Sequence, residues 1–244
     1  MFTPEVIKAA KNHARHDYPN ESCGLVIDNV YWPIKNISPN PRTAFAMPDT
    51  AWPVDAEVQA VIHSHTNGNV APTEPDIAGQ IRSAAPWGLI IARSNEVVSD
   101  PFFFGDGHTD HIPLLGRTWR NGPTGTDNAG DCYALVRDYY RREKSIRLND
   151  YPRNEDWLAD GHNFFVDNFE REGFEQISAD ELQPGDCFLM AVLSKGVPNH
   201  CGVYVGNGLG MHHLMNRLSR REPLHTWRKF ITHYLRYTGN TSGG

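Results

Sequence analysis

The chain has 244 residues, of which 39% are hydrophobic and 21% charged, a balance typical of a folded globular protein and not of a disordered or fibrous chain. Its length fits either one large domain or two compact ones. The formal net charge of −6 excludes sequence-independent nucleic-acid binding, which needs a cationic face that releases counterions. No run approaches the roughly 18 apolar residues that span a bilayer. The first residues lack the apolar core of a signal peptide, so we expect no export by the general secretory route.

Four cysteines bear on the compartment and on the chemistry. They are Cys23, Cys132, Cys187 and Cys201. They show neither C-x-x-C spacing nor the density of a disulfide-bonded scaffold. We therefore expect a reducing compartment and at least one free thiol that is available for chemistry.

The first hundred residues predict short strands between two helices. Thr3, Pro4 and Glu5 form a helix start, with a hydroxyl cap, a proline in the first turn and an acid at the positive end of the helix dipole. The apolar side of this helix consists of Val6, Ala9, Ala10 and Ala14. The elements expected after it are strands at 24–28, 30–34 and 61–62, a loop at 66–75, a helix at 76–84 and a strand at 87–92. Residues 54–59 fit either a helix or an extended turn.

Residues 99–130 differ in composition from the chain before them. Proline and glycine are frequent and the periodicity disappears, which predicts a domain boundary near residue 110. The elements expected beyond it are helices at 131–142 and 156–172, a turn at 182–186 and strands at 187–193, 201–205 and 209–214. Gly206, Asn207 and Gly208 predict the turn of a hairpin between the last two strands.

A candidate metal site lies at the end of the strand predicted at 61–62. His63 and His65 are two residues apart, and alternate side chains of an extended chain point the same way, so both imidazoles can face one ion. Asp76 opens the next predicted helix and can add a carboxylate oxygen. Two histidines and one carboxylate leave a fourth tetrahedral position for water, as catalytic zinc requires, and the ion would lower the pKa of that water. Glu21 is the candidate base for its proton.

The order of these residues is more specific than the histidine pair alone. The combined pattern resembles the signature of the JAMM, or MPN-type, metallopeptidases, and consists of Glu21-Ser22-Cys23-Gly24, His63-x-His65 and Thr73-x-x-Asp76. The resemblance covers roughly residues 1–105 of a domain expected at residues 1–108, and it implies a cytidine-deaminase-like α/β/α fold. It also implies Zn²⁺ on His63, His65 and Asp76, with Glu21 as general base and the Thr73 hydroxyl at the oxyanion. The family usually has serine where this chain has Thr73, and threonine keeps the donor but adds a methyl group.

A candidate nucleophile begins the helix predicted at 131–142. Asp131 is its expected cap, and Cys132 in the first turn lies at the positive end of the helix dipole, which favours the thiolate. The other three cysteines adjoin apolar strand sequence, which indicates buried packing thiols. A thiolate nucleophile requires a nearby histidine that is oriented by a further group. The predicted hairpin can bring His200 and His212 together for these roles.

The second half resembles the NlpC-type cell-wall cysteine peptidases. The motifs that carry this resemblance are Asp131-Cys132, Leu182-x-Pro184-Gly185-Asp186 and the run His200-x-Gly202-Val203-Tyr204-Val205-Gly206-Asn207-Gly208, followed by His212. The resemblance covers a domain at residues 112–244 and implies a papain-like α+β fold. It further implies Cys132 as nucleophile, His200 as base and His212 as orienting residue. The implied substrates are γ-D-glutamyl and related peptide bonds in the stem peptides of peptidoglycan.

Two details of this second domain are open. Many members of the family carry a tyrosine upstream of the cysteine that helps to form the oxyanion hole, and no tyrosine lies between Tyr31 and Tyr133. Trp119 or backbone N–H groups would then fill that role. His213 is the adjacent alternative to His212, but strand alternation should point it to the opposite face.

A JAMM unit joined directly to an NlpC-type unit resembles the tail-tip assembly proteins of lambda-like tailed bacteriophages. The sequence around the junction, at residues 112–117 and 131–140, is similar to that family too. The resemblance implies a role in tail-tip assembly or cell-wall penetration, with phage tail-tip proteins as partners and no membrane insertion. It places the protein in the cytoplasm of the infected bacterium during assembly, and then at the tail tip if it stays in the virion.

Three interpretations are compatible with these patterns. The first is a bifunctional peptidase, whose metal half cleaves a protein or isopeptide bond and whose thiol half cuts peptidoglycan stems. The second is an assembly factor in which the two folds serve as binding surfaces, with weak or vestigial activity. The third is a bacterial peptidoglycan-recycling peptidase that has no relation to phages.

Overall fold

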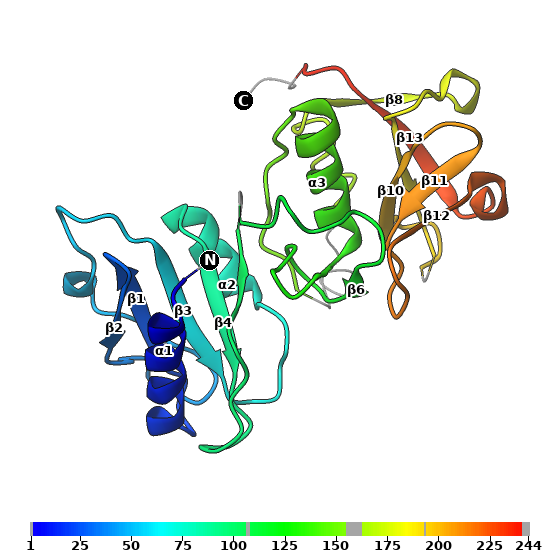
Figure 1. Ribbon diagram of the computed structural model, residues 1–244. Helices are drawn as coiled ribbons and strands as arrows, with labels where there is room; N and C mark the ends of the chain where they lie inside the picture. Colours follow the sequence, from blue (N-terminus) through cyan, green and yellow to red (C-terminus); the bar gives the residue numbers. More distant parts are fainter. Residues whose placement is uncertain (1, 106–107, 155–162, 193, 241–244) are drawn as a thin grey trace. The chain divides into compact units, whose positions relative to one another are not determined.

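The computed structural model describes residues 2–105, 108–154, 163–192 and 194–240 (Figure 1). The chain divides into two compact units, of which unit 1 comprises Met1–Thr109 and Gly125–Asp127, and unit 2 comprises Asp110–Thr124 and Asn128–Gly244. Both units combine helices with sheets, which confirms the expected α+β class. Among the described residues, no helix has the length and apolar character that crossing a membrane requires.

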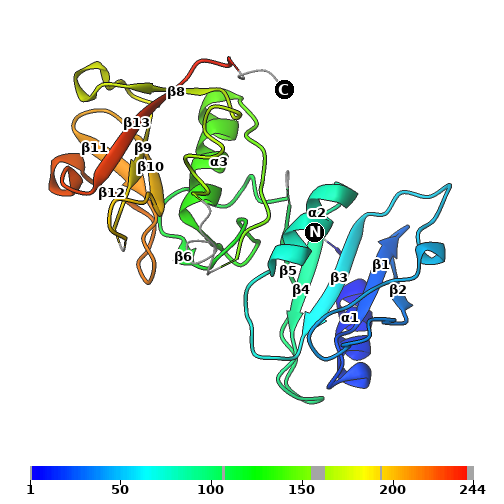
Figure 2. The same cartoon turned by 180° about the vertical axis from the view of Figure 1, so that it is seen from behind.

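Unit 1 is built on a five-stranded sheet with the order β2-β1-β3-β4-β5 (Figures 1 and 2). Its strands are β1 (Cys23–Ile27), β2 (Val30–Ile34), β3 (Ala60–His65), β4 (Trp87–Ile91) and β5 (Phe102–Phe104). The helix α2 (Glu74–Ser83) connects β3 to β4, which pair in parallel, and the other neighbouring strands pair antiparallel. This parallel crossover carries the chain from the end of β3 directly to the start of α2, which brings their polar residues together.

Apolar side chains cover both faces of the sheet in unit 1. The helix α1 (Pro4–Asp17) starts at the predicted cap, because the hydroxyl oxygen of Thr3 accepts from the N–H of Val6. Val6, Ala10 and Ala14 are buried against one face, whereas Ala9 is exposed, so that its predicted place in the apolar side was wrong. Trp87, Leu89 and Phe104 lie in the cluster on the other face.

Glycine brings α2 close to the sheet. A Cβ added to Gly79 would lie 2.3 Å from the ring of Trp87, which is closer than two non-bonded carbon atoms can approach.

The helix α2 begins two residues earlier than predicted, at Glu74, because Thr73 caps it. Residues 54–59 are neither helix nor strand, which excludes the helix among the two predicted alternatives. A 3₁₀ turn, η1 (Asp49–Ala51), precedes them.

Unit 2 is built on a six-stranded antiparallel sheet with the order β12-β11-β10-β9-β13-β8. Its strands are β8 (Phe174–Ile177), β9 (Cys187–Met190), β10 (His200–Tyr204), β11 (Leu209–His212), β12 (Arg220–Pro223) and β13 (Ile231–Tyr237), and the remaining elements are the pair β6 (Thr118–Trp119) and β7 (Ala129–Gly130), the helix α3 (Cys132–Lys144), and the 3₁₀ turns η2 (Ala179–Glu181) and η3 (Leu224–Trp227). The buried face of α3 packs against β9, β10 and β13 through Val136, Tyr140, Leu189, Val203 and Leu235. The predicted hairpin between β10 and β11 is confirmed.

In unit 2 the structure departs from the sequence-based prediction at one helix and, besides the two-residue strands β6 and β7, at three further strands. Residues 164–172 form consecutive turns instead of the predicted helix, and residues 156–162 of that prediction lie outside the described residues. The strands β8, β12 and β13 were not predicted. All three carry many half-buried or exposed side chains, so they lack the apolar run that marks a buried strand.

A buried arginine anchors the segment that opens unit 2. The side chain of Arg117 is fully buried, and its Nη1 donates to Asp138 Oδ2 of α3 at 2.6 Å and to Thr124 Oγ1 at 2.8 Å. Its Nη2 donates to the carbonyl of Ile112 at 3.1 Å, and its backbone N–H donates to Ser219 Oγ at 2.9 Å. A buried ion pair is favourable only when its remaining polar atoms are also paired. Arg117 meets that condition and ties the entry segment to α3.

We expect Arg117→Ala to lower the free energy of unfolding of unit 2 by about 3 kcal/mol, because it leaves a buried carboxylate without its main counter-charge. Hydrogen–deuterium exchange of α3 amides at increasing urea concentrations measures this loss. Arg147→Ala is the matched control, since that arginine is exposed, and its cost should stay within about 0.5 kcal/mol. Equal exchange in the two variants would contradict the anchoring role of Arg117.

Candidate functional sites

Three predicted metal-binding side chains converge in unit 1. His63 and His65 lie on the same face of β3, as strand alternation requires, with their Nε2 atoms 3.3 Å apart. Asp76, in the first turn of α2, lies with Oδ1 3.2 Å from Nε2 of His63 and with Oδ2 3.1 Å from Nε2 of His65. All three side chains are buried, and their ligand atoms lie within 4.8 Å of one another.

The surroundings prepare this cluster for a cation. Nδ1 of His65 lies 3.2 Å from the carbonyl oxygen of Asn69, which can only accept, so Nδ1 carries a proton. Nε2, which faces His63 and Asp76, is then the nitrogen that can ligate a cation. Burial opposes ionisation of Asp76, but His63 and then His65 hold its pKa well below the usual range. Two imidazole nitrogens and an ionised carboxylate are a donor set that suits Zn²⁺. The residues therefore fit the metal that the sequence pattern implies.

Glu21 lies beside this cluster, two residues before the start of β1. Its backbone is held by a hydrogen bond of 2.6 Å from its N–H to the carbonyl of Pro41. The side chain is 2% exposed, and among the described residues Oε1 has no hydrogen-bond partner. Burial raises the pKa of Glu21 to about 7. Glu21 lines the same pocket as His65 and Asp76.

Thr73 caps α2 and is engaged with the carboxylate of Asp76. Its hydroxyl donates to Oδ2 of Asp76 at 2.6 Å, and its backbone N–H donates to the same oxygen at 2.7 Å. In return, the N–H of Asp76 donates to the Thr73 hydroxyl oxygen at 3.4 Å, which completes a capping box. Thr73 thus lies at the cluster, with its hydroxyl proton directed at a predicted ligand.

The second site lies at the start of α3 in unit 2. Asp131 is the helix cap, as predicted, and its Oδ1 accepts from the N–H of Ala134 at 2.8 Å. Its Oδ2 accepts from the N–H of Gly122 at 2.8 Å and from Nε of Arg153 at 2.6 Å. Two other segments, at Gly122 and Arg153, therefore fix the turn that carries Cys132.

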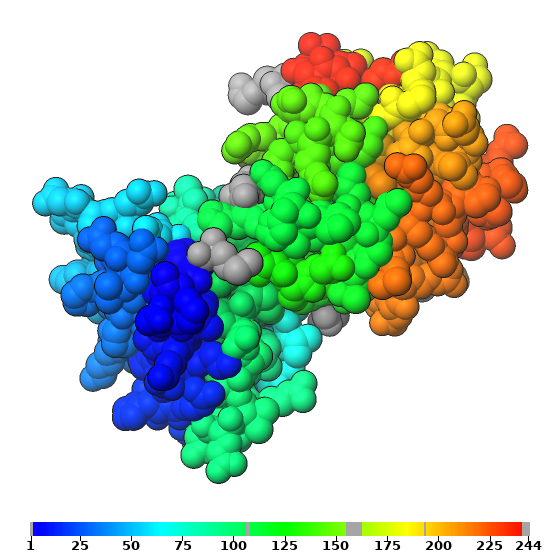
Figure 3. Space-filling model, in the orientation of Figure 1, coloured from blue at the N-terminus to red at the C-terminus, as the bar shows by residue number. Residues whose placement is uncertain are grey.

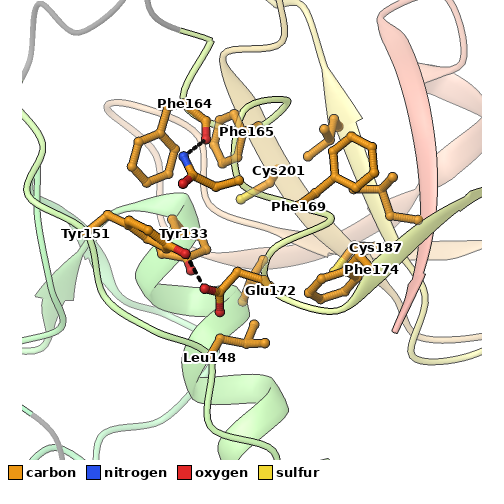
Figure 4. Close-up of a pocket in the computed structure, with 14 residues that line it drawn as sticks. Tyr133, Leu148, Tyr151, Phe164, Phe165, Phe169, Glu172, Phe174, Cys187 and Cys201 are labelled. Atoms are coloured by element: carbon orange, nitrogen blue, oxygen red, sulfur yellow. Dashed lines mark hydrogen bonds between the residues drawn. The ribbon is translucent and has the colours of Figure 1, made fainter. Parts of the chain in front are cut away.

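The environment of Cys132 stabilises its thiolate. A hydrogen bond from Cys201 lowers the pKa of Cys132, and the charge of His200 and a hydrogen bond with it lower this pKa further, against the opposing effect of burial. Cys201 lies on β10 and also lines the apolar pocket shown in Figure 4. Burial there raises the pKa of Cys201 well above its ordinary value. Cys201 therefore stays a thiol and donates to Cys132, a contact that sequence reasoning missed when it treated Cys201 as packing alone.

The two predicted histidines of this site are hydrogen-bonded to each other. Nε2 of His200 and Nδ1 of His212 lie 3.0 Å apart, and both side chains are buried. Gly202 stands directly opposite His212 in the β10–β11 ladder. A Cβ at Gly202 would lie 2.8 Å from the Cβ of His212. The absence of a side chain at this position therefore leaves space for the two imidazoles to come into contact.

His212 has a further partner, Glu222, that was not predicted from the sequence. Oε2 of Glu222 lies 2.8 Å from Nε2 of His212. Glu222 belongs to β12, a strand of sequence Arg-Arg-Glu-Pro. This strand lacks an apolar alternation that could have revealed its pairing.

Trp119 and His213 take the positions that the sequence left open. Trp119 lines the same pocket as Cys132 and His200. The ring of His213 lies edge-on to Trp119 at 5.3 Å, and its Nε2 is 3.1 Å from the carbonyl of Arg217. The histidine that contacts His200 is thus His212, while His213 is engaged with other groups.

Comparisons with known proteins find a family match for each half of the chain. The model of the NlpC/P60 family matches residues 116–236, and the model of the prokaryotic homologs of the JAB domain matches residues 3–103. Among solved structures, NlpC2 from Trichomonas vaginalis is 22% identical, with a TM-score of 0.36, over 54% of this chain and 48% of that chain.

Two curated relatives match both units together. Tail tip assembly protein K of Escherichia phage lambda is 34% identical over 171 residues, which cover 69% of this chain and 76% of the relative. Tail tip assembly protein K of Escherichia phage N15 is 30% identical over 232 residues, which cover 90% of this chain and 88% of the relative. With a JAB-like domain followed by an NlpC/P60 domain, the chain belongs to the phage tail tip assembly protein K family.

Proposed function

We propose that unit 2 is a thiol peptidase that cleaves stem peptides of peptidoglycan, and that unit 1 is a zinc-dependent peptidase or isopeptidase. The observation that carries the proposal is the position of Cys132 at the start of α3, in the pocket that His200 also lines; His200 lowers the pKa of this thiol. A thiolate that is stabilised by a helix start and an adjacent histidine is the nucleophile of an acyl transfer.

The reaction in unit 2 follows from these groups. Sγ of Cys132 attacks the carbonyl carbon of the scissile bond, and His200 gives its proton to the leaving nitrogen as the C–N bond breaks. Water then attacks the thioester, with His200 as base, and releases the acid and the thiol. The first amides of a helix have no intrahelical acceptor, so the N–H of Cys132 can donate to the oxyanion, with Trp119 at the same pocket.

In unit 1, His63, His65 and Asp76 would hold Zn²⁺, which supplies a Lewis acid and lowers the pKa of a bound water. Glu21 would take the proton of that water on its unpartnered Oε1. A carboxyl group whose pKa is about 7 suits a base that takes and returns a proton at neutral pH. Thr73 keeps Asp76 oriented through its two hydrogen bonds.

The setting follows from the relatives, whose names describe tail tip assembly. We infer that the partners are phage tail-tip proteins and that the protein acts in the host bacterial cytoplasm during assembly, and at the tail tip where it remains in the virion. These names favour a phage role over peptidoglycan recycling by a bacterium.

Two observations favour a second candidate, an assembly factor with weak peptidase activity. The hydroxyl of Thr73 is committed to Asp76 and therefore offers its proton to a ligand instead of to an oxyanion. Cys132, for its part, is only 6% exposed. Digestion of purified peptidoglycan by the wild type and by Cys132→Ala separates this candidate from the bifunctional peptidase.

We expect about one Zn²⁺ per chain in protein purified without chelators, and its loss in His63→Ala, because one of three ligands is gone. Metal analysis by mass spectrometry measures both. His16→Ala is the matched control, since that side chain is 87% exposed and should leave the metal content unchanged. A wild-type protein free of any divalent metal after exposure to Zn²⁺ would remove the metallopeptidase proposal.

Among the four thiols, we expect iodoacetamide to label Cys132 first at neutral pH, because its pKa is lowered while burial raises the pKa values of Cys23 and Cys187 to about 12. Labelling should abolish digestion of purified peptidoglycan, as should Cys132→Ala. Peptide mapping and mass analysis of the released fragments measure these outcomes.

Cys23→Ala and Glu21→Ala are the controls for this digestion. Both changes lie in unit 1, so both variants should release the same fragments as the wild type. Undiminished digestion by Cys132→Ala would refute the thiol peptidase. Loss of a distinct product in Glu21→Ala alone would instead assign that product to unit 1.

A further inference from the structure

Three strands of unit 2 align a chain of hydrogen-bonding side chains that ends at Glu222. His212 is paired in register with Gly202 of β10 on one side and with Arg220 of β12 on the other. His200 and Glu222 are each two residues from those partners, so all three side chains lie on one face of the sheet as diagonal neighbours. The distances are 3.0 Å from His200 Nε2 to His212 Nδ1 and 2.8 Å from His212 Nε2 to Glu222 Oε2.

We propose that Glu222 is a positioning residue of the thiol site, whose carboxylate holds His212 in the tautomer protonated on Nε2 and thereby leaves Nδ1 of His200 free to accept the proton of Cys132. The inference rests on the proposed role of Cys132 as nucleophile. It adds a fourth member to the three residues expected from the sequence.

The donors and acceptors in this chain determine which nitrogen of each imidazole carries a proton. An ionised carboxylate only accepts, so Nε2 of His212 must carry the hydrogen of the bond to Glu222. Burial lowers the pKa of His212, and the ring is therefore neutral, with an unprotonated Nδ1. That nitrogen accepts, so Nε2 of His200 must donate to it. In neutral His200 the proton is then on Nε2, and Nδ1 is the nitrogen that is left to act as base.

The charge of Glu222 also stabilises the charged form of His200. When His200 takes the proton of Cys132, it becomes positively charged. The neutral His212 lies between this charge and the carboxylate of Glu222, whose side chain is only 21% exposed. Trp227 lies edge-on to His212 at 5.2 Å and limits the access of water to these side chains. A partly desolvated carboxylate acts more strongly than one in bulk water.

The other charged groups around these hydrogen-bonded side chains act on the same equilibrium. Arg220 pairs with Oε1 of Glu222 at 2.8 Å and partly offsets its charge. Cys201 lowers the pKa of Cys132, and Asp131 raises it. Burial and then the charge of His200 lower the pKa of His213. Of these, Glu222 is the one acid that is hydrogen-bonded directly to His212 in the described residues. The side chains of β12 are half-buried or exposed, and this strand belongs to the orange region that is visible at the surface in Figure 3.

The test compares Glu222→Gln with Glu143→Gln in the full-length protein. Glutamine keeps the size of the side chain and an acceptor oxygen but removes the charge, and Glu143 is an exposed acid of α3. The rate of Cys132 alkylation by iodoacetamide is measured at about pH 6 and at about pH 10, above the ordinary pKa of a thiol. Ring ¹⁵N shifts of the histidines in the wild type report the tautomers.

For Glu222→Gln we expect a rate about tenfold lower at about pH 6, where the thiolate depends on the charged His200, and an unchanged rate at about pH 10, where it does not. Glu143→Gln should match the wild type at both values. An unchanged rate at about pH 6 in Glu222→Gln, or a wild-type His212 protonated on Nδ1, would overturn the proposal. The tautomer measurement decides the matter even where the variant unfolds.

This design separates the inference from the thiol peptidase itself. If wild-type Cys132 reacts no faster than Cys23 at about pH 6, the proposed nucleophile fails and Glu222 has no site to position. If wild-type Cys132 reacts rapidly and Glu222→Gln behaves the same, only the role of Glu222 is lost.

Discussion

The capped start of α3 is the constraint on which the thiol site depends. Asp131 accepts hydrogen bonds from Ala134, Gly122 and Arg153, so the first turn cannot rotate or fray without breaking bonds to two other segments. The cap fixes Cys132 at the positive end of the helix dipole. Because the same helix packs on β10, the thiol meets Cys201 and His200 of that strand. The helix dipole thus favours the thiolate of Cys132, and the packing of α3 on β10 places the sulfur beside Cys201 and His200.

Strand geometry assembles the histidines of both units, but in two different ways. In unit 1, His63 and His65 are two residues apart on one strand, so a single local pattern places both rings. In unit 2, the pairing of β10 with β11 and of β11 with β12 places His200, His212 and Glu222 diagonally across three strands. The first arrangement is set by sequence spacing alone, whereas the second depends on the register of the sheet.

That difference explains how much the sequence could predict. The spacing of His63 and His65, the cap at Asp131 and the β10–β11 hairpin are local features, and the structure has each of them. Glu222 is on an edge strand with exposed side chains, so neither its strand nor its contact could be read from periodicity. The contact of Cys201 with Cys132 joins a strand to a helix 69 positions earlier in the numbering and has no local signal. The helix expected at 156–172 fails at residues 164–172, where turns stack Phe164, Phe165 and Tyr133 together.

The two sites also differ in how far function is separable from folding. In unit 1, Asp76 belongs to the capping box that starts α2 and is also a proposed metal ligand. A change there removes a helix cap and a ligand together, so a loss of activity cannot by itself reveal which one mattered. In unit 2, the cap is Asp131 and the thiol is Cys132, two different residues. Removing the thiol leaves the hydrogen bonds of the cap in place, and for this reason unit 2 is where chemistry can be removed while the fold is retained.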